Sequence, residues 1–81
     1  MRYFGAAKAA TGVGEERLPG GRTLAAVLDE LRARPVPPGA PSLATVLERS
    51  SFLLNEVALR DTSTVLADDD VLDVRPPFAG G

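Results

Sequence analysis

The fold is decided by the stretch Thr23-Leu24-Ala25-Ala26-Val27-Leu28-Asp29-Glu30-Leu31-Arg32-Ala33-Arg34, the most regular pattern in the chain. Its large apolar residues follow the spacing i, i+3, i+4 and i+7, which places them on one face of a helix; they are Leu24, Val27, Leu28 and Leu31. Thr23 is a residue type that caps helix N-termini, and Pro35 ends the helix after Arg34. The stretch therefore predicts one principal helix with an apolar face that must pack on another element.

Short extended segments lie on both sides of this helix. Alternating or apolar runs bounded by turn residues predict strands at residues 1–6, 15–18, 51–55, 57–60 and 71–75. Two short helices are expected as well, one at residues 7–11 that ends at Gly12 and one that begins after Ser42. Strands around one main helix predict an α+β protein. A β-grasp fold fits this order, with a mixed five-stranded sheet, the first two strands as a hairpin, and the first and last strands as parallel central neighbours.

Residue alternation assigns faces to the first and last strands. Leu72 and Val74 share one face of the last strand and are expected in the core, whereas Arg75 lies on the other face. In the first strand Arg2 and Phe4 share a face, so Phe4 is expected to be exposed beside Arg2. A shift of one residue would instead bury Phe4 and expose Tyr3.

The composition excludes several classes of function. The 81 residues form one domain, and no apolar run approaches the ~20 residues of a membrane span. The basic residues are scattered and the net charge is −2, so there is no footprint for nucleic acid. Without Cys and His the chain lacks thiolate and imidazole catalysis and the usual zinc ligands. We therefore expect a cytoplasmic protein that acts as a substrate, carrier or subunit rather than as an autonomous enzyme.

The last six residues form a separate unit, which we call the tail. They read Pro76-Pro77-Phe78-Ala79-Gly80-Gly81 and follow a β-grasp domain expected over residues 1–75. The prolines block helix and favour an extended chain, which can reach about 20 Å over this length. The glycine pair narrows the end of the tail to bare backbone. This shape suits insertion of a terminal carboxylate into a narrow site on a partner protein.

The three aspartates Asp68-Asp69-Asp70 are the one feature that suggests a metal. Calcium loops space their oxygen ligands along a longer loop with a distal Glu. A solvated turn between strands is the simpler interpretation, and we expect no metal.

The whole chain resembles the MoaD/ThiS family of ubiquitin-like sulfur carriers. The resemblance rests on the first strand Met1-Arg2-Tyr3-Phe4, on Leu54-Asn55 in a hairpin, on the approach Asp68-Asp69-Asp70-Val71, and on the tail. The tail is the specific part, because Pro-Pro-x-x-Gly-Gly is similar to the ending of the small subunit of molybdopterin synthase. Thiamin-branch carriers share the Gly-Gly but usually lack the two prolines.

The resemblance implies a chemistry centred on Gly81. No cofactor is bound; an E1-like adenylating enzyme with ATP and magnesium would adenylate the terminal carboxylate. A sulfur donor protein would then convert it to a thiocarboxylate. The large subunit of molybdopterin synthase would receive the tail, so that sulfur builds the dithiolene of molybdopterin.

The same resemblance suggests which residues meet a partner. The inserted residues would be Gly80, Ala79, Phe78, Pro77 and Pro76, although Phe78 could instead fold back on its own sheet. Phe4, Leu59 and Arg75 are candidates for the partner interface. Three alternatives stay open: a carrier for thiamin, cysteine or tRNA thiolation, a ubiquitin-like protein modifier, or a non-covalent β-grasp interaction module.

Overall fold

The structure is a computed structural model that describes residues 1–36 and 38–77. Within these residues the order of elements is β1 (Arg2–Tyr3), α1 (Gly5–Thr11), β2 (Arg22–Thr23), α2 (Leu24–Arg32), α3 (Leu43–Arg49), β3 (Ser51–Leu54), β4 (Val57–Ala58), β5 (Val65–Leu66) and β6 (Leu72–Arg75). The loop between α2 and α3 contains the prolines that exclude regular structure. The tail is described only as far as Pro77.

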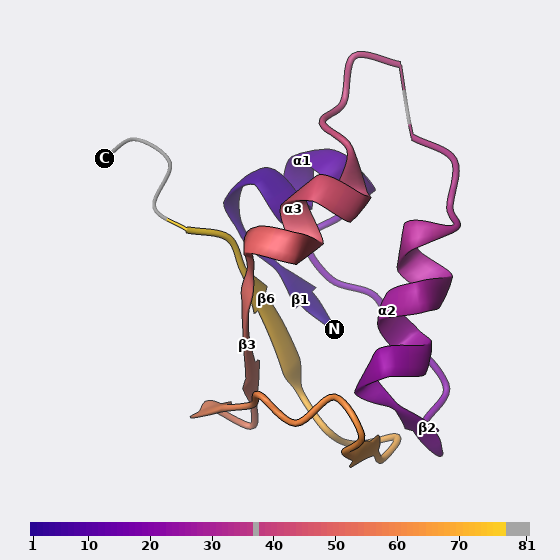
Figure 1. Ribbon diagram of the computed structural model, residues 1–81, viewed down its shortest axis with the longest axis vertical. Coiled ribbons are helices and arrows are strands. Elements are labelled where there is room, and N and C mark those ends of the chain that lie inside the picture. The colour runs from indigo at the N-terminus through magenta and orange to yellow at the C-terminus, as the bar shows by residue number, and fades with distance from the viewer. Residues whose placement is uncertain (37, 78–81) are drawn as a thin grey trace.

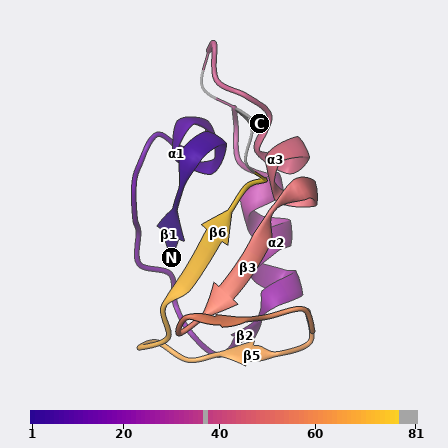
Figure 2. The same ribbon diagram turned by 90° about the vertical axis from the view of Figure 1, so that its left-hand side faces the viewer.

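The main sheet has the order β1-β6-β3-β4 in the described part of the chain. β6 pairs parallel with β1 and antiparallel with β3, which in turn pairs antiparallel with β4. Figure 2 shows β1, β6 and β3 in front of α2, so the principal helix crosses one face of the sheet. This arrangement is the expected α+β, β-grasp fold, with the first and last strands as parallel neighbours. The expectation of a five-stranded sheet with both of these strands at its centre is wrong in the described residues, because the main sheet has four strands and β1 lies at its edge.

The principal helix begins as the sequence indicates and ends slightly earlier. The Ala26 amide donates a hydrogen bond of 3.1 Å to the hydroxyl of Thr23, the expected N-cap. α2 ends at Arg32 rather than Arg34, because the amides of Ala33 and Arg34 also bond to carbonyls three residues back. Such tightening of the last turn is common, and Pro35 prevents any continuation.

The core lies between α2 and the inner face of the sheet (Figure 1). All four residues of the predicted helical stripe are buried, and so are Leu72 and Val74 of β6. Tyr3 is buried and Phe4 is exposed, which confirms the expected register of the first strand. The remaining buried apolar residues come from α1, α3 and β5; they are Ala7, Ala10, Leu43, Val46, Leu47 and Leu66.

The hairpin of β3 and β4 has the turn that the sequence predicts. Asn55 and Glu56 both have positive φ, 50° and 71°, between the paired residues Leu54 and Val57. Two central residues with positive φ form the turn whose twist matches paired strands. The Asn55 side chain bonds to Asp70 (3.0 Å) and accepts from the Val71 amide (2.9 Å), which fixes the turn to the entry of β6.

The first strand is shorter than expected, and the strand predicted at residues 15–18 does not form. β1 stops at Tyr3 because Gly5, with φ of 51°, turns the chain into α1. Only Glu15 forms an isolated bridge, to Arg2. The Glu16 amide donates to the Met1 carbonyl at 2.9 Å, but Arg17 is exposed and Pro19 has no amide to continue a ladder.

Side-chain hydrogen bonds, rather than strand pairing, attach the segment around Glu16 to the rest of the domain. The Glu16 carboxylate accepts hydrogen bonds from the Tyr3 hydroxyl and from Arg34 at 2.7 Å. Burial and the hydrogen bond to Glu16 raise the pKa of Tyr3. Burial acts to raise the pKa of Glu16, but the bonds from Tyr3 and Arg34 outweigh it and lower that pKa. The charged cluster therefore fastens this segment to β1 and to the end of α2.

Val65 and Leu66 form a strand, β5, that the sequence analysis did not predict. β5 pairs antiparallel with β2, with Arg22 opposite Leu66 and Thr23 opposite Val65, in a two-stranded sheet of its own. Leu66 faces the core and Val65 is exposed. The pair lies at the end of the molecule away from α1 and α3 (Figures 1 and 2). None of the helices in the described ranges has the length and apolar character needed to cross a membrane.

Candidate functional site

The candidate site is the end of β6 and the sheet surface around it. β6 ends at Arg75, at the same end of the molecule as α1 and α3 (Figures 1 and 2). Pro76 is half-buried beside the start of α1, where a Cβ added to Gly5 would lie 3.9 Å from its Cγ, and Pro77 is exposed. The predicted tail residues Phe78, Ala79, Gly80 and Gly81 lie outside the described residues.

Phe4 stands on the sheet surface next to this exit. Its amide donates a hydrogen bond of 3.2 Å to the Val74 carbonyl, which extends the parallel pairing one residue beyond β1. The ring points away from the core and is 37% exposed. Because side chains alternate along strands, Phe4 and Arg75 share the face of the sheet opposite α2. We call this the outer face.

The sequence analysis missed a buried ion pair at the centre of the outer face. Asp73 is only 1% exposed, and Arg2 covers it from the neighbouring strand. Arg2 Nε and Nη2 donate hydrogen bonds of 2.6 and 2.7 Å to the two carboxylate oxygens. The hydrogen bond from Arg2 and the nearby positive charges of Arg2 and Arg75 lower the pKa of Asp73, against the effect of burial. Alternation along β6 places Asp73 on this face, but no local sequence pattern indicates that Arg2 buries it.

Arg75 completes the cluster beside Phe4. Its guanidinium carbon lies 4.6 Å from the centroid of the Phe4 ring, and that of Arg2 lies at 5.9 Å. Both distances fall within the range of cation–π attraction. Arg75 approaches Asp73 to 3.7 Å, and its side chain remains 51% exposed. The structure thus brings together two of the three predicted interface residues, Phe4 and Arg75.

Leu59 does not join them. Its amide bonds to the Phe52 carbonyl at 2.8 Å, and its half-buried side chain packs against the core cluster. It lies one residue beyond the outer-facing position in β4, where Ala58 pairs with Leu53. The outer-facing residues of the hairpin are therefore Leu53 and Ala58, and Leu59 belongs to the opposite side of the sheet.

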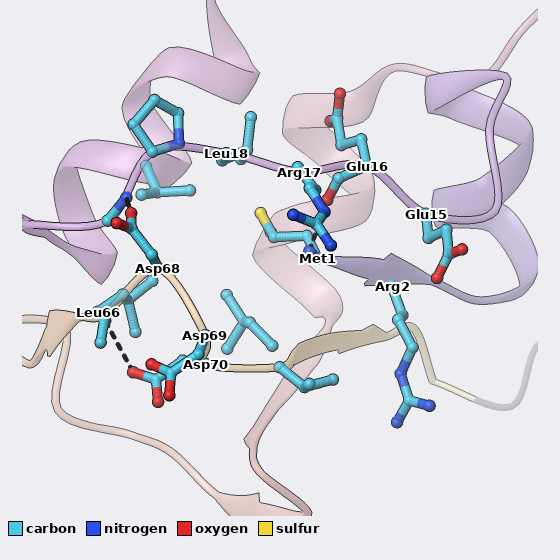
Figure 3. A pocket seen from close by; sticks show the side chains of 16 residues that line it. Met1, Arg2, Glu15, Glu16, Arg17, Leu18, Leu66, Asp68, Asp69 and Asp70 are labelled. Atoms are coloured by element: carbon cyan, nitrogen blue, oxygen red, sulfur yellow. Dashed lines mark hydrogen bonds between the residues drawn. The ribbon is translucent and has the colours of Figure 1, made fainter.

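The aspartate turn shapes a groove away from the tail. An open groove of about 930 Å³ lies between the segment after α1 and the approach to β6. Figure 3 shows Asp68, Asp69 and Asp70 at one end of it and Glu15 and Glu16 at the other. Asp68 accepts from the Gly20 amide (2.6 Å) and Asp70 from the Ala67 amide (2.8 Å), so both carboxylates stabilise turns. No group of three acidic residues suited to a metal ion occurs in the chain as far as it is described.

Comparison with known proteins gives one positive result. The family model described as the ThiS family matches residues 1–81, the whole chain. A search of curated proteins found no match. Members of this family are ubiquitin-like sulfur carriers that work with E1-like adenylating enzymes and a catalytic subunit. The β-grasp sheet, which leads its central strand directly into the tail, agrees with that match. The chain therefore belongs to the ThiS family of ubiquitin-like sulfur carriers.

Proposed function

We propose that the chain is the sulfur carrier subunit of molybdopterin synthase and that Gly81 is its reactive end. The observation that supports this most directly is the ending Pro76-Pro77-Phe78-Ala79-Gly80-Gly81 after the central strand β6. Pro-Pro-x-x-Gly-Gly resembles the molybdopterin branch of the family. A glycine pair without the prolines would fit the thiamin branch equally well.

The first half of the mechanism activates the carboxylate of Gly81. An E1-like partner, which holds ATP and magnesium, lets a carboxylate oxygen attack the α-phosphorus of ATP, and pyrophosphate leaves. Sulfide-level sulfur released by a donor protein then attacks the acyl carbon, and AMP leaves. The product is a thiocarboxylate, a sulfur nucleophile held on the carrier.

The second half takes place on the large synthase subunit. Pro76 and Pro77 stiffen the tail, and Phe78, Ala79 and Gly80 enter the partner with Gly81. The thiocarboxylate sulfur attacks a carbon of a cyclic pterin phosphate and displaces an oxygen substituent, which leaves the carrier bound to the product as a thioester. Water then hydrolyses the thioester and returns the Gly81 carboxylate, so each carrier supplies half of the dithiolene. The proton-transfer and nucleotide-binding groups belong to the partners, which fits a chain without Cys or His.

A second candidate is a sulfur carrier for thiamin. The family match favours it to the same degree, because the match covers the full chain without separating the branches. A protein modifier begins with the same adenylation, and differs when an amine of a target protein replaces the sulfur donor.

The test follows sulfur from the carrier to its product. The chain is adenylated and sulfurated, and its intact mass should rise by about 16 Da, one oxygen replaced by sulfur, with fragmentation placing the change on Gly81. The sulfurated carrier is then offered separately to a large molybdopterin synthase subunit with its pterin substrate and to a thiazole synthase. Molybdopterin formation supports the proposal. Turnover only by thiazole synthase assigns the chain to thiamin. A matched control, extended by one residue after Gly81, should fold but fail to gain mass.

A further inference from the structure

The outer face carries one guanidinium, that of Arg75, whose charge its neighbours compensate only in part. Arg2 and Arg75 contribute two guanidinium charges, and Asp73 supplies one carboxylate between them. Arg2 occupies both oxygens of Asp73, so Arg75 is left at 3.7 Å, beyond hydrogen-bond distance. Glu15 and Glu56 add negative potential on the side of Arg2. Arg75 is therefore the guanidinium of this pair that lacks a hydrogen-bonded carboxylate.

Arg75 is presented to solvent in a restrained position. Phe4 lies under its guanidinium at 4.6 Å, and the Phe4 backbone is fixed to Val74 by a hydrogen bond. A guanidinium that packs on an aromatic ring still has the N–H donors in its own plane available to bind a carboxylate. Within residues 1–36 and 38–77, no acceptor bonds to the Arg75 side chain at hydrogen-bond distance. This side chain is thus oriented before any partner arrives, which lowers the entropy cost of pairing.

The position of Arg75 makes it part of any encounter that uses the tail. It immediately precedes Pro76, so a protein that receives residues 78–81 must also cover the end of β6. The proposed reactive end lies six residues further along the chain, a length that can span about 20 Å when a partner binds it in an extended form. Arg75 can therefore affect docking but does not reach the reacting carboxylate.

We infer that Arg75, supported by Phe4 and held apart from Asp73 by Arg2, is a specificity-determining residue that pairs with a carboxylate on the E1-like adenylating partner. The carboxylate belongs to an Asp or Glu at the rim of the tail-binding site, next to an apolar patch that covers Phe4. We assign it to the adenylating enzyme because every pathway of this family begins there. The inference thus rests on the carrier function but not on the molybdopterin branch.

The test measures ATP–pyrophosphate exchange by the adenylating enzyme as the concentration of carrier is varied. Arg75→Glu should raise the KM for the carrier by about tenfold or more and leave kcat within about twofold, because only docking is affected. Arg75→Gln should raise KM less than Arg75→Glu does. Its KM should also increase less with salt concentration than the KM of the wild type. The matched control is Arg32→Glu on α2, the same charge reversal on the other side of the sheet, which should leave both constants near wild type.

Thermal unfolding confirms that each variant is folded. If Arg75→Glu perturbs the fold, the KM of Arg75→Gln is used in its place to test the inference. An unchanged KM in Arg75→Glu overturns the inference, as does an equal rise in Arg32→Glu. A fall in kcat at unchanged KM also overturns it, since Arg75 would then act on the chemistry. If only the later transfer to a synthase subunit is impaired, the assignment to the adenylating partner is wrong. Failure of the molybdopterin proposal would appear instead in the product test above, with exchange intact.

Discussion

Arg2 holds the buried carboxylate of Asp73 through two hydrogen bonds, across the parallel pair of β1 and β6. The two residues are 71 positions apart in the sequence. The pair therefore joins the first strand of the domain to the last, next to Phe4 and Arg75 on the outer face.

The first prediction concerns stability in acid. The pKa of Asp73 is lowered in the folded state, mainly by the bond from Arg2. The unfolded chain therefore binds this proton more readily, and the stabilisation is lost as the pH falls from the unfolded value of about 4 through the lower folded value. Asp73→Asn should be less stable than wild type near neutral pH but should lose less on going from about pH 5 to about pH 2.

Urea unfolding at a series of pH values checks this. Glu16 also has a lowered pKa, so the acid dependence of Asp73→Asn should be reduced rather than abolished. If the free energies of unfolding of wild type and Asp73→Asn fall in parallel as the pH is lowered, the Asp73 carboxylate contributes nothing to the acid dependence of stability.

The second prediction concerns the principal helix. Leu31 is fully buried on the predicted stripe, so Leu31→Ala should lower the free energy of unfolding by about 2–5 kcal/mol. Val65 is 61% exposed on β5, and Val65→Ala should change it by only about 0.5 kcal/mol. Denaturant titrations measure both variants, and equal losses would contradict the assignment of the core.

The third prediction concerns the hairpin turn. Glu56 has φ of 71°, a conformation that costs an ordinary residue about 1–2 kcal/mol relative to glycine. Glu56→Gly creates an Asn-Gly pair, the preferred sequence for this turn, and should raise the melting temperature. The matched control Glu48→Gly lies within α3 and should lower it, since glycine weakens helices by about 1 kcal/mol. A decrease in both variants would argue against a positive φ at Glu56.

The fourth prediction concerns the turn from β1 into α1. Gly5 has φ of 51°, while the space around it would accept a Cβ, because the nearest atom is Pro76 Cγ at 3.9 Å. Gly5→Ala should therefore destabilise the protein by about 1 kcal/mol through backbone strain rather than through a clash. Gly14→Ala, where φ is not in the left-handed region, should be close to neutral. Calorimetry of the two variants distinguishes them.

The fifth prediction concerns Phe78. If Phe78 anchors the tail in a partner, Phe78→Ala should weaken the complex with the adenylating enzyme and leave thermal stability almost unchanged. If Phe78 instead packs on its own sheet, the variant should lose about 3–5 kcal/mol of stability, as expected for a fully buried Phe. Isothermal titration and thermal unfolding of the same samples separate these outcomes.

Local patterns predicted those parts of the fold that depend on neighbours in the sequence. The helical stripe, the Thr23 and Ser42 caps and the positive φ of Asn55 all follow from residues a few positions apart. The strand at residues 15–18 was predicted from a short run bounded by turn residues, and the prediction is wrong because only one residue there has a bridging partner. The pairing of β2 with β5 was missed for the converse reason, since two residues on each strand are too few for a periodic signal.

The candidate site was predictable only in part for the same reason. Phe4 and Arg75 could be placed on the outer face from alternation, and the structure confirms that placement. The burial of Asp73 depends on Arg2, and a pattern of neighbouring residues cannot predict a partner that lies 71 positions away in the sequence. Leu59 was misplaced because its face depends on the register of the hairpin, which pairs Ala58 with Leu53 on the outer face and so turns Leu59 toward the core. The roles of residues 78–81 stay predictions.

The position of β6 has a mechanical consequence. The strand that leads into the tail is bonded on both sides, to β1 and to β3, so a pull on the tail runs along the strand and across its hydrogen bonds. Those bonds must shear together, whereas a strand at the edge could be peeled away one bond at a time. A partner can therefore draw the tail in and release it repeatedly while the body of the carrier keeps its shape.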